Sequence, residues 1–302
     1  MQKTAFPRDR IVALVFISNS FVPVEYADLM LDDARAQTNR IDVAAQKVAD
    51  RARLTWLQPS RILSAHWGCS GFPRAMMLIQ EDLLQRMQLG EEDAIIVVAA
   101  TRTSRITDYE DRVSSPLLGD YATATLITRL DSRLLPARYE LIAAMTGVQQ
   151  VPQINFGHEW RRNVLVPTSQ GGETRDSERF CFWLDGDVIY KYAPQIMADT
   201  ACQALEKFGI RPTEPDFLIP HQAGAGIGRW FDRFRTEKGI AGEFINGYCA
   251  ESGNITSCSI PYTFAENWDS LRGLIVCPTA GVGNPGESSM SCGCVAFRHI
   301  GN

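Results

Sequence analysis

Short apolar runs rich in β-branched residues alternate along this chain with stretches whose apolar residues have helical spacing. Residues 11–18 (IVALVFIS) and 61–67 (RILSAHW) have the composition of buried strands. Between 72 and 90, apolar residues recur at a helical spacing, and Gly90 is expected to end this helix. The run 94–101 (AIIVVAAT) predicts the next strand.

The same alternation returns in the second half of the chain. Residues 187–210 predict a long helix, and 216–222 (DFLIPHQ) predict a strand that runs into a loop. Residues 274–283 and 292–300 predict a closing pair of strands. Buried strands separated by helices favour an α/β fold with sheets covered by helices on both faces. Residues 102–175 are richer in charged and turn residues, which predicts loops that shape a site or an interface.

A loose twofold organisation accompanies this pattern, with one strand–helix set before about residue 170 and another after it. We therefore expect an N-terminal half of residues 1–170 and a C-terminal half of residues 171–302. A chain of 302 residues is long enough to bury the core of such a protein.

Composition and charge narrow the function classes. Hydrophobic residues make up 45% and charged residues 22% of the chain, and the net charge is −5. This balance gives no electrostatic case for binding nucleic acid or an anionic membrane. Apolar runs fall short of the roughly 18–20 residues that span a bilayer. The apolar stretch near the N-terminus favours a buried strand over a signal peptide, so we expect a cytoplasmic protein.

The eight cysteines are scattered and form neither a CxxC pair nor a zinc-ligand spacing. Most are expected to be small buried hydrophobes, so a reactive cysteine must be identified by its surroundings. No metal site and no resident cofactor are expected.

Cys69 has surroundings that suit a nucleophile. It follows a predicted strand, precedes the apolar helix and is flanked by Gly68 and Gly71. A thiol at a helix N-terminus faces unpaired N–H groups, which favour the thiolate. A packed core cysteine remains an equal alternative on this context alone.

His221 and Asn254 are two further candidates. His221 ends a predicted apolar strand and enters a glycine-rich stretch, where a side chain can face a pocket. Asn254 lies in residues 251–261 (ESGNITSCSIP). Taken singly, each has a structural alternative: a packed histidine, and an asparagine that caps a helix or forms a turn.

Five short motifs connect these candidates. Cys69 begins residues 69–72 (CSGF), His221 lies in 220–223 (PHQA), and Asn254 lies in 253–261 (GNITSCSIP). The other two motifs are residues 119–124 (GDYATA) and the glycine-rich stretch 281–293. In this order they resemble the motifs of the thiolase superfamily, and within it those of the β-ketoacyl-ACP synthase III-like condensing enzymes.

This resemblance implies a thiolase-like α/β fold of two related halves, with mixed sheets layered between helices (αβαβα). It implies that Cys69 is acylated by a thioester and that the backbone N–H groups of Cys69 and Ser289 stabilise the oxyanion. His221 and Asn254 would donate hydrogen bonds to the carbonyl of a malonyl-type thioester as it decarboxylates. A neutral Asn at 254 suits this task, whereas Asp would repel the developing charge.

The resemblance also implies partners. The acyl donor would be an acyl-carrier-protein or coenzyme A thioester, used in fatty-acid-like or polyketide metabolism. The basic residues after His221 would form a docking surface for an acidic carrier protein: Arg229, Arg233, Arg235 and Lys238. A solvated helix face is an equal alternative, because Asp232 and Glu237 interrupt the run. A homodimer, or a heterodimer with a related subunit, is expected.

One departure from the family concerns the N-terminus. Residues 11–20 resemble a family strand that normally lies well inside the first half. The segment that precedes it in the family supplies part of the coenzyme A pocket, so its lack of a counterpart here favours carrier-protein delivery. Two alternative functions stay open: acyl transfer to an oxygen or nitrogen acceptor, and a non-catalytic thiolase-fold partner subunit.

Overall fold

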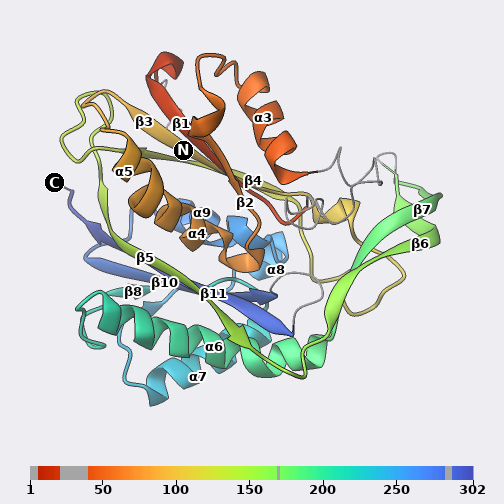
Figure 1. Cartoon of the computed structure of the whole chain (residues 1–302). Helices are drawn as coiled ribbons and strands as arrows, with labels where there is room; N and C mark the ends of the chain where they lie inside the picture. Colours follow the sequence, from red (N-terminus) through yellow and green to blue (C-terminus); the bar gives the residue numbers. More distant parts are fainter. Residues whose placement is uncertain (1–5, 21–39, 169–170, 283–287, 302) are drawn as a thin grey trace.

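A computed structural model describes residues 6–20, 40–168, 171–282 and 288–301. The first sheet has the strand order β2-β1-β3-β4 (Figure 1). Its strands are β1 (Ile11–Ile17), β2 (Ile62–Ala65), β3 (Ala94–Thr101) and β4 (Tyr121–Thr128). Strand β1 runs parallel to β2 and β3, and β4 is antiparallel to β3. The predictions of strands at 11–18, 61–67 and 94–101 are confirmed.

The helix predicted between residues 72 and 90 is present but ends earlier. It comprises α4 (Gly71–Leu78), a π-helical turn (Ile79–Leu83) and α5 (Leu84–Arg86). The predicted end at Gly90 is wrong because Met87 is already extended and Gly90 belongs to a separate turn. The backbone N–H of Gly90 donates to the Asp93 carboxylate at 2.9 Å, which closes that turn.

The second sheet has the order β5-β11-β10-β8-β9. Its strands are β5 (Tyr139–Gln150), β8 (Phe217–Leu218), β9 (Glu243–Phe244), β10 (Leu274–Val282) and β11 (Ser289–His299). Strands β10 and β11 are antiparallel neighbours, so the predicted closing pair is confirmed. The predicted strand at 216–222 is confined to Phe217–Leu218.

Five layers result from the packing of helices on these sheets (Figure 1). Helix α3 (Ile41–Arg51) covers the outer face of the first sheet. Helices α4 and α9 (Ser259–Glu266) lie between the two sheets, near the short α8 (Cys249–Ser252). Helices α6 (Gly186–Lys207) and α7 (Ala225–Glu237) pack together beside the second sheet. The predicted αβαβα layering is confirmed.

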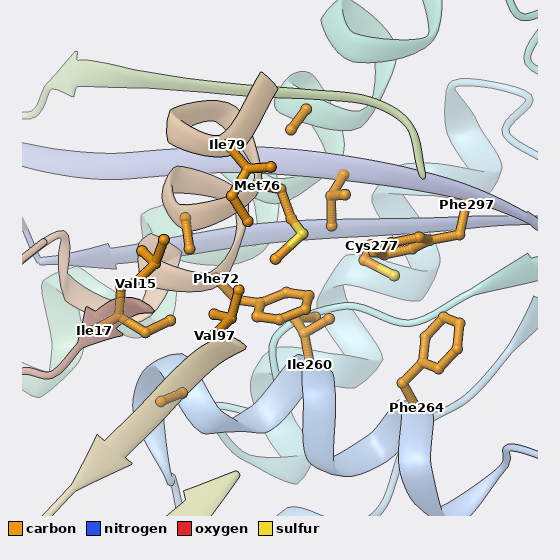
Figure 2. Close-up of a cluster of buried hydrophobic side chains, with 14 of the residues drawn as sticks. Val15, Ile17, Phe72, Met76, Ile79, Val97, Ile260, Phe264, Cys277 and Phe297 are labelled. Carbon is orange, nitrogen blue, oxygen red and sulfur yellow. The ribbon is translucent and has the colours of Figure 1, made fainter. Parts of the chain in front are cut away.

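The central apolar core lies between the two sheets (Figure 2). Phe72 and Met76 of α4 meet Ile260 of α9, Val97 of the first sheet and Cys277 of the second. Burial of these side chains fixes the start of α4, and with it residue 69, against both sheets.

The prediction of loops over residues 102–175 is wrong for much of this range. It contains β4, β5 and most of a long antiparallel hairpin of β6 (Phe156–Pro167) and β7 (Glu173–Leu184). Strands β6 and β7 form a sheet of their own, and β7 is largely exposed over its first half. Polar residues are therefore tolerated on this hairpin, and the apolar alternation that marks a strand is weak.

Candidate active site

Cys69 lies in a turn, Gly68–Ser70, that directly precedes α4. This turn packs against β10, β11 and the turn Thr256–Cys258. Gly68 has φ +52°, and a Cβ there would lie 2.3 Å from the Val282 carbonyl oxygen. A Cβ on Gly281 would lie 2.6 Å from the Cys69 nitrogen and 3.1 Å from its sulfur. The two glycines therefore allow the β10 backbone to approach the cysteine closely.

The protonation state of Cys69 differs from the sequence-based prediction. Although part of the residue reaches solvent, burial of the thiol raises the pKa of Cys69 to about 12. A hydrogen bond from the Asn254 side chain has the opposite and smaller effect, because it lowers the pKa. The predicted preference for thiolate is wrong for the free site, because Cys69 precedes α4 by two residues and loss of hydration dominates.

Three hydrogen bonds hold Asn254 in place. Its backbone N–H donates to the Leu117 carbonyl at 2.6 Å, and its own carbonyl accepts from Gly119 N–H at 3.1 Å. Its side-chain Oδ1 accepts from the Thr256 N–H at 2.9 Å. Because Oδ1 is engaged in this way, Nδ2 is the end that donates to the Cys69 sulfur.

His221 is buried just beyond β8. Its backbone N–H donates to the Pro278 carbonyl at 2.9 Å, which ties it to β10. Its Nδ1 is 2.8 Å from the Ser259 Oγ, which also accepts from the Gln222 N–H at 3.2 Å. Its Nε2 is buried and has no hydrogen-bond partner among the residues that the structure describes. Burial lowers the pKa of His221 to about 3, so the ring is neutral near neutral pH.

The three predicted catalytic residues converge on one region of the fold. Asn254 contacts Cys69 directly through a hydrogen bond. His221 is attached at Pro278, next to Thr279, whose hydroxyl donates to the Ser70 Oγ at 2.9 Å. The segment 254–259 therefore bonds to both His221 and Cys69, which stand far apart in sequence.

The second proposed oxyanion donor, Ser289, is buried at the first position of β11. Residues 283–287 of the glycine-rich stretch lie outside the described residues. The role of the Ser289 N–H therefore stays a prediction.

Sequence reasoning missed three supporting residues. The Ser259 hydroxyl contacts Nδ1 of His221, and the Thr256 N–H donates to Oδ1 of Asn254. The Ser291 hydroxyl donates to the Trp67 carbonyl at 3.2 Å, just before the Cys69 turn. Ser259 and Thr256 stand within the recognised motif 253–261, which was a usable signal. Ser291 stands within the recognised stretch 281–293, but its contact with Trp67 joins distant segments and could not be predicted from that motif.

The predicted basic docking surface carries less free charge than the sequence suggests. Arg233 pairs with Glu237 at 2.8 Å, Arg235 with Asp232 at 2.7 Å, and Lys238 with Asp199 at 2.6 Å. Arg229 is exposed on α7 and forms no ion pair within the described ranges. The four cations do lie on or next to one helix, as predicted.

No group of at least three His, Cys, Asp or Glu side chains within the described ranges is arranged to hold a metal ion. No helix in the same part of the chain has the length and apolar character to cross a membrane.

Comparisons with known proteins find similar sequences and similar folds. The family model described as 3-oxoacyl-[acyl-carrier-protein (ACP)] synthase III matches residues 64–140. A β-ketoacyl-[acyl-carrier-protein] synthase III of Azobacteroides pseudotrichonymphae is 27% identical over 206 residues, which are 67% of this chain. This chain spans 56% of that relative's length, little more than half.

Solved structures show the same fold. The 3-oxoacyl-[acyl-carrier-protein] synthase III of Aquifex aeolicus superposes with a TM-score of 0.66 at 18% identity, over 97% of this chain and 78% of that one. The priming β-ketosynthase of the R1128 polyketide pathway gives a TM-score of 0.65 at 18% identity, over 97% and 76%. The predicted thiolase-like fold is confirmed.

Proposed function

We propose that this chain is a β-ketoacyl-ACP synthase III-like acyl-thioester condensing enzyme, which its similarity to such proteins supports. Cys69 carries the acyl group, and His221 and Asn254 assist its condensation with a malonyl-type thioester. The observation that carries the proposal is the hydrogen bond that aims the Asn254 amide at the Cys69 sulfur.

In the first step, the Cys69 sulfur attacks the carbonyl carbon of the donor thioester. The thiol proton passes to the donor's sulfur, which leaves as a free thiol, and Cys69 keeps the acyl group as a new thioester. The N–H groups of Cys69 and Ser289 stabilise the oxyanion of the tetrahedral intermediate.

In the second step, the malonyl-type thioester loses carbon dioxide and its α-carbon attacks the acyl-Cys69 carbonyl. The new carbon–carbon bond forms as the Cys69 sulfur leaves and takes up a proton. Nδ2 of Asn254 and Nε2–H of His221 donate to the thioester oxygen on which enolate charge develops. Ser259 is suited to hold this tautomer, because its hydroxyl can donate to Nδ1 while its oxygen accepts from Gln222.

Two uncharged groups favour this reaction over acyl transfer to an alcohol or an amine. An amide that donates and a neutral imidazole suit an enolate, whereas a transfer to an acceptor hydroxyl calls for a base placed at that hydroxyl. Burial keeps His221 a weak base, with a pKa of about 3.

The delivery of the acyl group is part of the proposal. The donor is a carrier-protein or coenzyme A thioester, and exposed Arg229 is the docking cation best placed to meet an acidic carrier protein, since its three neighbours pair within the chain. The product belongs to fatty-acid-like or polyketide metabolism. A second copy, or a related subunit, completes a dimer.

Replacement of Asn254 by Ala tests the proposal. We expect the condensation rate to fall by about 100-fold, because a hydrogen bond to the developing enolate is lost. Self-acylation of Cys69 should fall only severalfold, since it loses just the hydrogen bond that lowers the pKa of Cys69. Radiolabelled product and acyl-enzyme, measured on the same samples, separate the two steps. Equal losses in both steps would remove the role given to Asn254.

A further inference from the structure

The orientation of the Asn254 amide depends on one backbone N–H group. An asparagine amide can present either oxygen or nitrogen to a neighbour, and its hydrogen bonds decide which. Here Oδ1 accepts from the Thr256 N–H at 2.9 Å. Without that donor, the amide is free to turn its oxygen toward Cys69, where it could not donate to an enolate.

Thr256 presents this N–H from an unusual conformation. Its φ is +49°, in the left-handed region that β-branched residues rarely adopt. A backbone in this region persists only where surrounding contacts hold it. The contact that holds residue 256 therefore bears on the direction of the Asn254 amide.

Thr101 supplies such a contact. It is the last residue of β3, and the Thr256 hydroxyl donates to its Oγ1 at 3.0 Å. Both residues are buried, with exposed fractions of 3% for Thr101 and 5% for Thr256. Thr101 is held in the first sheet by its pairing with Tyr121 of β4, so it is a rigid anchor for the turn Thr256–Cys258, which packs against β3.

We infer that Thr101 is a positioning residue of the active site. Through Thr256 it holds the N–H that fixes Oδ1 of Asn254, and so keeps the Asn254 Nδ2 donor directed at Cys69 and the substrate carbonyl. This inference rests on the proposed function of Asn254. It gives the first sheet a part in the second step of catalysis without any contact between Thr101 and the substrate.

Replacement of Thr101 by Val, which keeps the shape and removes the hydroxyl, tests the inference. We expect condensation to slow by about tenfold, as for the loss of one well-placed hydrogen bond, while self-acylation slows by only about threefold. Alkylation of Cys69 by iodoacetamide at alkaline pH should slow by about threefold, because a misdirected amide no longer lowers the thiol pKa. Thr101→Ser, which retains the hydroxyl, should restore all three rates to within about twofold of the original.

Thr263 provides a matched control. It is fully buried in α9, and its hydroxyl lacks a hydrogen-bond partner in the described part of the chain. Thr263→Val should therefore leave the ratio of condensation to self-acylation unchanged. Melting temperatures of all variants separate local misdirection from general loss of folding.

The outcomes distinguish this inference from the proposed function. If Thr101→Val matches the original protein while Asn254→Ala loses condensation, Thr101 is not a positioning residue and the proposed function stands. Equal loss of both steps in Thr101→Val, or failure of Thr101→Ser to restore them, would also overturn the inference. If Asn254→Ala condenses normally, the proposed function fails, and the alkylation rate of Cys69 alone decides the role of Thr101.

Discussion

In His221 and Asn254, hydrogen bonds within the protein use one polar atom of the side chain and leave the other for a substrate. In each side chain one polar atom is fixed by the protein: Nδ1 by Ser259 and Oδ1 by Thr256. The opposite nitrogen of His221 is buried without a partner among the described residues. A buried polar atom without a partner lowers the stability of the fold by about 1–3 kcal/mol. A substrate carbonyl that accepts a hydrogen bond from this nitrogen would remove that penalty on binding.

Burial of His221 has a consequence for stability. Its pKa is about 3 in the folded protein and near 6.5 in an unfolded chain. Below about pH 6.5 the unfolded state binds a proton that the folded state does not, so a falling pH favours unfolding. We expect this one residue to remove about 2 kcal/mol of the free energy of unfolding between about pH 7 and pH 5.

Urea unfolding at both pH values measures this effect. The original protein should lose about 2 kcal/mol more than His221→Gln, which cannot take up a proton in this range. Contributions from the other histidines cancel in the difference. The same loss in both proteins would mean that His221 is not held neutral by burial.

At the scale of elements, the approach of β10 to the Cys69 turn positions the proposed nucleophile. Gly281 lies against the nitrogen and sulfur of Cys69, where a methyl group has no room. Gly281→Ala should therefore displace the turn, slow self-acylation by about 100-fold and lower the free energy of unfolding by about 1–3 kcal/mol.

Gly147→Ala is the matched control for this substitution. Gly147 also lies in a strand of the second sheet, but its added Cβ would meet the Cys292 sulfur at 3.4 Å, an ordinary contact. We expect its self-acylation rate to stay within about twofold of the original. A Gly281→Ala protein that acylates as fast as the Gly147→Ala control would show that β10 does not constrain Cys69.

The elements also show what the sequence could predict. Strands β1 and β3 and helices α4 and α6 are buried on at least one side, so their apolar patterns identified them. The β6–β7 hairpin was not predicted, because its strands are held by backbone pairing and need no apolar pattern. The motifs located Cys69, His221 and Asn254, but the direction of the Cys69 pKa depended on burial by distant segments.

At the scale of the whole molecule, the two sheets act as separate supports for one site. The first sheet holds Thr101, and the second holds β10 beside Cys69. The segment 254–259 bridges them, since it bonds to Thr101, to Cys69 and to His221. Catalytic groups supported in this way keep their geometry only if both layers are folded together.

The central claim is that Cys69 carries an acyl group, and intact-protein mass spectrometry tests it most directly. After incubation with acyl-coenzyme A and acyl-carrier-protein donors, we expect one added acyl mass per chain. The adduct should be absent from Cys69→Ala and retained in Cys249→Ala, which removes another partly exposed cysteine. No adduct with any donor, or an adduct that persists in Cys69→Ala, would contradict the account.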